Sequence, residues 1–108
     1  MAKSDLLQGT LDLLLLKVLA IGPNHGWGIS NRIRQMSQEG LDASQGSLYP
    51  ALHRLEQRGE VRSEMTVSEN NRRARVYTIT PAGRRRLNAE RRGWEQFALS
   101  MQRVLEAE

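Results

Sequence analysis

Apolar side chains recur at helical spacing near the start of the chain. Leu11, Leu14, Leu15, Val18 and Leu19 fall at positions i, i+3, i+4, i+7 and i+8, which predicts a helix over about residues 6–20 with one buried face. The leucines that lie off this face are Leu6, Leu7, Leu13 and Leu16. A helix of a small domain does not need apolar side chains nearly all round, so the surplus favours packing against a second subunit.

A second helix is predicted directly after the first. The tripeptide Gly-Pro-Asn at 22–24 ends the first helix. The spacing of Ile29, Ile33 and Met36 then predicts a helix over residues 26–37, with these three side chains as its buried stripe.

A third helix follows the glycine at position 40. Ser44 is its expected N-cap, because a serine hydroxyl can accept a hydrogen bond from a free backbone N–H one turn further on. Leu48, Leu52 and Leu55 form the inward row, and Gly59 is the expected C-terminal stop.

The pattern then changes to that of strands. Residues 60–67 and 75–80 are rich in β-branched and aromatic side chains, and the polar residues 68–73 between them predict a hairpin tip. Thr80 and Pro81 open another helix, with a hydroxyl cap followed by proline at the first helical position.

The last helix is predicted from Pro81 to about Leu105. Leu87, Trp94 and Met101 are spaced seven residues apart, and further apolar residues repeat the second heptad position, as in a short coiled coil. A terminal helix with such a seam packs on a partner, so we expect a homodimer. The expected interface residues are Leu6, Leu13, Leu16, Leu87, Trp94, Phe97, Met101, Val104 and Leu105.

This order of elements predicts the fold class. Three short helices, two strands and a long helix give a mainly α fold with a two-stranded β-wing (α+β), a winged helix-turn-helix with a long C-terminal dimerisation helix. We expect residues 1–80 to form the DNA-binding part and residues 81–108 the dimerisation helix of one compact domain.

Positive charge is concentrated in one stretch. The whole chain carries a formal charge of +4, but residues 72–92 hold eight arginines against one acid, Glu90, a net charge of +7 that leaves −3 for the remainder. A localised basic field suits a polyanionic partner. The alternative is a solvated arginine-rich face without a partner.

Other classes of protein find little support. The absence of cysteine excludes disulfides and thiol catalysis. The apolar run 11–21 is interrupted by Asp12 and Lys17 and is too short to cross a bilayer, so we expect an intracellular protein. His25 and His53 are the only histidines and lack carboxylates at metal or triad spacing, so we expect no enzyme, metal or cofactor.

A helix with a polar stripe beside a basic hairpin is typical of DNA-binding proteins. Side chains near the start of such a helix reach base edges in the major groove, and arginines at a wing tip reach phosphates or the minor groove. The predicted DNA-binding residues are Ser44, Gln45, Gly46, Ser47, Tyr49, Pro50, His53, Arg54, Arg72, Arg73 and Arg75.

Several of these residues have simpler alternative roles. Capping would explain Ser44, packing against the second helix would explain Tyr49, and His53 would be a plain surface residue. Of the arginines at 84–86, one is expected near DNA. Trp94 either packs in the dimer seam or lines a ligand pocket, and these two roles are compatible.

Three segments resemble the PadR-like family of transcriptional regulators: GPNHGWGISNRI, SQGSLYPALHRLEQRGEV and NNRRARVYTITPAGRRRL. The likeness extends from about Leu11 to Trp94. It implies a homodimeric repressor in the bacterial cytoplasm, nucleoid-associated when bound, which binds a palindromic operator and is released by a small hydrophobic or aromatic effector. The family's short form, with one C-terminal helix, fits the length of this chain.

Two positions depart from the family pattern. Trp27 stands where many relatives carry tyrosine, which keeps an aromatic ring but loses a hydroxyl. Asn71 stands where many carry glycine at the wing tip, and asparagine tolerates the left-handed conformation that such a turn requires. The alternative functions are a small-molecule-binding dimer and a protein adaptor that has lost specific DNA readout.

Overall fold

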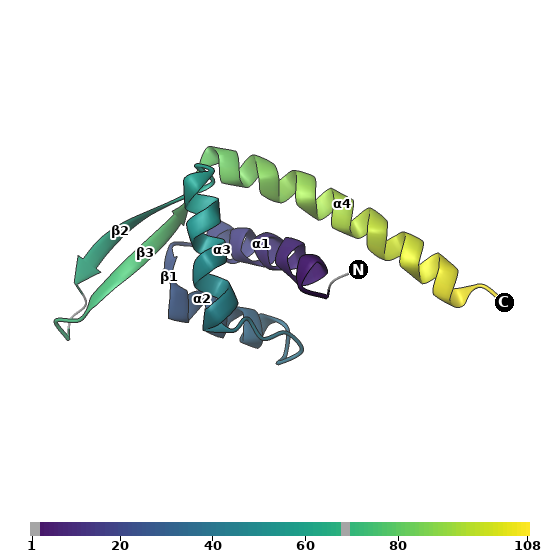
Figure 1. Cartoon of the computed structure of the whole chain (residues 1–108), viewed down its shortest axis with the longest axis horizontal. Coiled ribbons are helices and arrows are strands. Elements are labelled where there is room, and N and C mark those ends of the chain that lie inside the picture. The colour runs from purple at the N-terminus through teal and green to yellow at the C-terminus, as the bar shows by residue number, and fades with distance from the viewer. Residues whose placement is uncertain (1–2, 68–69) are drawn as a thin grey trace.

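The computed structural model describes residues 3–67 and 70–108, with the side chains of residues 3–9 and 45 outside that description. Its elements are α1 (Lys3–Ile21), β1 (Asn24–His25), α2 (Gly26–Met36), α3 (Gln45–Gln57), β2 (Val61–Val67), β3 (Arg73–Ile79) and α4 (Pro81–Glu106). This order confirms the predicted fold class and adds the short strand β1, which the sequence pattern did not indicate. Figure 1 shows the wing and α4 projecting from opposite sides of the helical body.

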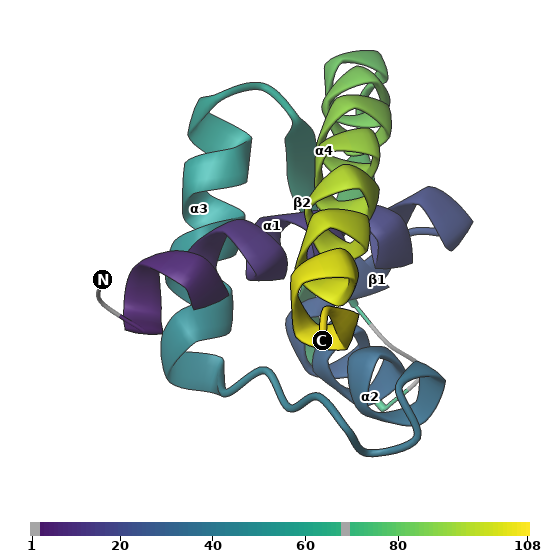
Figure 2. The ribbon, with the colours of Figure 1, turned by 90° about the vertical axis from the view of Figure 1, so that its right-hand side faces the viewer.

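Helix α1 is the centre of the fold. Helices α2, α3 and α4 and strand β3 all contact it, as Figure 2 also shows for the helices. Leu15, Leu16 and Leu19 are therefore buried by elements of the same chain. This burial corrects the expectation that Leu16 faces a second subunit. Leu13 is only partly buried, and the side chain of Leu6 lies outside the described residues.

The sheet has the strand order β1-β3-β2 and is antiparallel throughout. Val61 pairs with Ile79 at its base, where both side chains are buried, and Val67 pairs with Arg73 near the tip, where both are exposed. The base of the wing is thus part of the hydrophobic core, and its outer end projects into solvent (Figure 1).

The turn between α3 and β2 ends the helix in the predicted way. Gly59 has a φ of 73°, a left-handed conformation that glycine adopts without steric cost. The Gly59 N–H donates to the Glu56 carbonyl, and the Glu60 N–H donates to the Leu55 carbonyl at 2.9 Å. These two bonds form a Schellman motif, which satisfies carbonyls at the end of α3.

Thr80 caps α4 as predicted. Its Oγ1 accepts a hydrogen bond from the Gly83 N–H at 3.1 Å and donates one to the Gly59 carbonyl at 2.6 Å. One hydroxyl therefore joins the turn after α3 to the start of α4. Gly83 itself packs so closely on the Glu60 carbonyl that a Cβ atom would collide with it.

Helix α4 runs from the base of the wing past α1 to the far end of the molecule (Figures 1 and 2). Leu87 in its first half is buried in the chain's own core, which corrects its expected place in an exposed seam. The second half exposes apolar side chains, including Leu99, which the heptad pattern had not included. The exposed residues are Trp94, Phe97, Leu99, Met101, Val104 and Leu105.

Candidate nucleic-acid interface

Helix α3 is held by one buried face and presents the other to solvent. Leu48, Ala51, Leu52 and Leu55 are completely buried, because α1 and α2 pack against this side. The predicted reading residues lie on the rest of the surface, and those with described side chains are exposed: Ser44, Gly46, Ser47, Tyr49, Pro50 and His53. The side chain of Gln45 lies outside the described residues.

Ser44 stands at the N-cap of α3, but its side chain makes no capping bond to the backbone. Its Oγ donates instead to the Ser47 Oγ at 3.3 Å, and both serines are exposed. Ser44 therefore occupies the predicted N-cap position, but its hydroxyl does not cap the helix. Two hydroxyl groups are left together at the start of the helix, where they can hydrogen-bond a base or a phosphate.

Tyr49 combines the two roles that the sequence left open. Its ring lies against Gly26 at the start of α2, so closely that a Cβ atom at position 26 would come within 2.6 Å of it. The side chain nevertheless keeps 44% of its surface exposed. Packing on α2 thus fixes the ring without removing it from the surface of α3.

The wing presents arginines on strand β3 and in the preceding turn. Arg72, Arg73 and Arg75 are all exposed, and Asn71 adopts the left-handed conformation that its position in the tip led us to expect, with a φ of 59°. Arg75 Nη1 donates to the Ser63 Oγ at 3.0 Å across the wing. The guanidinium groups therefore lie on the surface, where they can neutralise phosphates.

A polar link joins the wing to α3. The Ser63 Oγ, which accepts the bond from Arg75, donates to Glu56 Oε2 at 2.7 Å. Burial, together with the negative charge of Glu56, raises the pKa of the Tyr77 hydroxyl above its usual range. The orientation of the wing relative to α3 is thus fixed by specific contacts.

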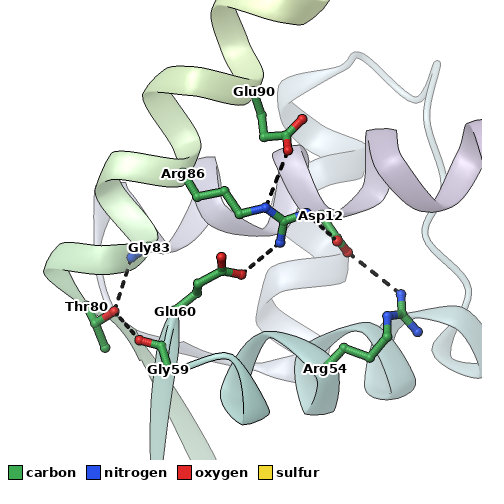
Figure 3. Close-up of polar contacts among 8 residues, drawn as sticks. All are labelled: Asp12, Arg54, Gly59, Glu60, Thr80, Gly83, Arg86 and Glu90. Atoms are coloured by element: carbon green, nitrogen blue, oxygen red, sulfur yellow. Dashed lines mark hydrogen bonds and ion pairs between the residues drawn. The ribbon is translucent and has the colours of Figure 1, made fainter.

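Arg54 points away from the exposed face of α3. Its Nη2 lies 3.7 Å from Asp12 Oδ1, and the side chain is only 35% exposed (Figure 3). The sequence placed Arg54 among the phosphate-binding residues, whereas the structure gives it a partner on α1. Reaching DNA would require this arginine to leave Asp12.

A cluster of charged residues beneath the interface escaped the sequence reasoning. Arg86 of α4 donates to Asp12 Oδ2 at 3.1 Å, to Glu60 Oε1 at 2.7 Å and to Glu90 Oε1 at 3.4 Å (Figure 3). Burial lowers the pKa of Arg86, but the hydrogen bonds to Glu60 and Asp12 outweigh this effect and raise it. Arg86 is therefore a structural cation, and only Arg84 and Arg85 of the triplet are exposed.

An apolar groove lies between α1 and α4, on the side of the exposed seam. It encloses about 450 Å³ and is lined by Leu13, Leu14, Leu87 and Trp94, with Lys17 and Arg91 among the charged residues beside them. Trp94 is 50% exposed there. The groove can accept either an apolar side chain or a small hydrophobic molecule.

The described ranges 3–67 and 70–108 contain no cluster of three or more metal-binding side chains. No helix within the same ranges combines the length and the hydropathy needed to cross a membrane.

The three helices, the wing and the long terminal helix define a winged helix-turn-helix protein. A solved structure of a transcriptional regulator from Clostridium thermocellum superposes with a TM-score of 0.85 at 28% identity, covering 94% of this chain and 99% of that one. Bacillus subtilis PadR in complex with operator DNA shares the fold at a TM-score of 0.67 and 22% identity, over 74% of this chain and 44% of that one.

The sequence comparisons assign the family. The model of the transcriptional regulator PadR-like family matches residues 15–89, so the chain belongs to this family of transcriptional regulators. It is also similar to the transcriptional regulator Rv3488 of Mycobacterium tuberculosis, with 46% identity over 65 residues. That match covers 60% of each of the two proteins, less than two thirds of the relative's length.

Proposed function

We propose that the chain is a homodimeric repressor, acting at the nucleoid in the bacterial cytoplasm, which binds a palindromic operator and is released by a small hydrophobic or aromatic effector. The observation that carries this proposal is the exposed polar face of α3 beside an arginine-bearing wing, in a chain that belongs to a family of transcriptional regulators.

Helix α3 is proposed to enter the major groove by its N-terminal half. Ser47 and His53 offer groups for bases or phosphates, and Tyr49 offers a hydroxyl with an apolar ring for a thymine methyl. The other residues proposed to contact DNA at the start of this helix are Ser44, Gln45, Gly46 and Pro50. Arg72, Arg73 and Arg75 are proposed to neutralise phosphates or enter the minor groove from the wing.

The second half of α4 is the proposed dimer interface. Its apolar side chains are exposed in the isolated chain, and burying them against a second copy would remove a large apolar surface from water. A two-fold axis through these helices would place two copies of α3 on one side of a duplex. Half-sites would then lie about 34 Å apart, one turn of DNA, or a multiple of it, and form a palindrome.

The groove beside Trp94 is the proposed effector site. Its apolar lining and the exposed indole suit a flat hydrophobic molecule, and Lys17, Arg91 and Glu95 place charges of both signs beside it. Because the groove lies between α1 and α4, an occupant would alter the contact between the dimerisation helix and the DNA-binding part.

Operator binding is tested with fluorescently labelled duplexes from the region upstream of the protein's own gene. We expect a complex that survives competition by unrelated DNA and weakens steeply with added salt. Arg73→Ala should lower the slope of log affinity against log salt by about one. Arg103→Ala, which removes an exposed arginine near the end of α4, is the matched control and should leave the slope unchanged.

The absence of any sequence-specific, salt-sensitive complex would contradict the repressor. The groove then favours the second candidate, a dimer that binds small molecules without reading DNA. Titration with anilinonaphthalene sulfonate, followed by its fluorescence in the native chain and in Trp94→Ala, distinguishes the two. Probe binding at Trp94 without DNA affinity would support this second function.

A further inference from the structure

Two aromatic side chains lie stacked and accessible at the start of α2. The rings of His25 and Trp27 are 6.1 Å apart between centroids and inclined by only 12°. Trp27 is 60% exposed, the larger exposure of the two tryptophans, and His25 is partly buried. Most of the indole surface is therefore available to a partner.

The position of this pair is fixed by both parts of the proposed interface. His25 belongs to β1 and pairs with Val76 of β3, the central strand of the sheet that forms the wing. The next residue, Gly26, lies under the ring of Tyr49 on α3. The pair therefore lies beside β3 of the wing and close to Tyr49 of α3, and Figure 1 shows β1 next to β3.

Local hydrogen bonds hold the pair rigidly. The His25 Nδ1 accepts a bond from the Gly28 N–H at 3.1 Å and caps α2, and the His25 N–H donates to Asn24 Oδ1 at 2.9 Å. Because Nδ1 is the acceptor, the ring proton is on Nε2, on the other side of the ring from the helix.

The pair thus offers two donors, His25 Nε2–H and the indole N–H of Trp27, each on a flat aromatic ring. Neither group has a hydrogen-bond partner among the residues that the structure describes. A sugar–phosphate backbone matches this chemistry, because its phosphate oxygens accept hydrogen bonds and its deoxyribose packs on an aromatic face. The exposed Tyr49 on one side and the wing arginines on the other make duplex DNA the partner that would contact all three.

We propose that His25 and Trp27 form a third DNA contact, which binds a phosphate and its sugar between the segments bound by α3 and by the wing. This inference rests on the proposed operator binding. Unlike the guanidinium groups of the wing, the indole of Trp27 carries no charge, so its contact would add affinity that salt does not screen.

The first test measures operator affinity by fluorescence anisotropy for Trp27→Ala and His25→Asn. Asparagine can still cap α2 but lacks the ring and the Nε2 donor, so α2 should stay intact. Each change is expected to weaken binding about tenfold, the size of a good interfacial contact. The salt slope should stay that of the native chain, in contrast to Arg73→Ala.

Met36→Ala is the matched control. The prediction that Met36 belongs to the buried stripe of α2 is wrong, because the residue is 50% exposed at the opposite end of this helix. The affinity of this variant should equal that of the native chain. Unchanged affinity in Trp27→Ala, or an equal loss of affinity in Met36→Ala, would overturn the proposed contact. The proposed function would stand in either case, provided that the native chain binds the operator. Failure of the native chain to bind any operator would overturn both.

A second measurement does not depend on truncating the pair. In Trp94→Phe the indole of Trp27 is the only tryptophan, so its emission reports on this position alone. Adding operator duplex should shift or quench the emission, and unrelated duplex should do so only at low salt. Emission that stays constant while anisotropy records binding would also overturn the contact.

Discussion

At the scale of single residues, the least expected feature is a charge placed inside a leucine-rich helix. Asp12 is only 6% exposed, and its two carboxylate oxygens face Arg54 of α3 and Arg86 of α4. Burying a carboxylate is costly unless cations and hydrogen bonds compensate. Asp12 therefore links α3 and α4 to α1 at the centre of the fold.

Replacing Asp12 by asparagine keeps the shape of the side chain but removes its negative charge. This change should destabilise the chain by about 1–3 kcal/mol, because Arg86 and Arg54 lose their buried counter-charge. The loss is measured as the free energy of unfolding in urea. Glu95→Gln is the matched control, since the Arg91–Glu95 pair is 3.9 Å long and more than half exposed, and its loss should cost under about 0.5 kcal/mol. Equal effects of the two changes would argue against the role given to Asp12.

At the scale of elements, one hydroxyl makes two of the contacts at the junction of α3, the wing and α4. Thr80 caps α4 and also donates to the Gly59 carbonyl, so one side chain joins the end of α3 to the start of α4. The close approach of Gly83 to Glu60 presses α4 onto the base of the wing at the same place. A movement of α4 would therefore displace the C-terminal end of α3.

Thr80→Val keeps the shape of the side chain but removes both hydrogen bonds. We expect a loss of about 1–2 kcal/mol in unfolding free energy, the usual cost of a lost helix cap. Thr80→Ser keeps the hydroxyl and should cost clearly less. If serine proves as damaging as valine in thermal unfolding, the methyl group rather than the hydroxyl holds this junction.

At the scale of the whole molecule, the apolar surface of α4 is too large to be explained by the isolated chain. The helix passes beyond the body, and its last turns expose Val104 and Leu105 by 73% and 75%. A second copy of the helix is the partner that its heptad spacing suits. The first half of α4 thus packs in the core of its own chain through Leu87, and the second half is proposed to pack on the partner through Trp94.

Trp94→Ala should raise the dissociation constant of the dimer by about 100-fold, as expected for an aromatic anchor at the centre of an interface. The folded monomer should be little affected, because half of the indole is already exposed. Sedimentation over a dilution series measures the effect, and Gln96→Ala, an exposed polar residue on the same helix, is the control. A native chain that sediments as a monomer at micromolar concentration would contradict the proposed dimer.

The sequence by itself determined the features that depend on near neighbours. The helices, the caps at Thr80 and Gly59, the left-handed Asn71 and the wing could be predicted because helical periodicity, hydroxyl caps and turn residues act within about one turn of chain. The family resemblance rested on the same local segments, and residues 15–89 match the family.

Only the tertiary structure decided which side chains face one another across the fold. Asp12 and Arg86 are 74 positions apart, and no local pattern pairs them or turns Arg54 inward. Leu16 is buried rather than Leu14 because four elements surround α1, which a single helical face cannot reveal. The pairing of β1 with β3 places His25 and Trp27 near α3. These two strands lie far apart in the chain, so the pairing forms only when the whole fold assembles.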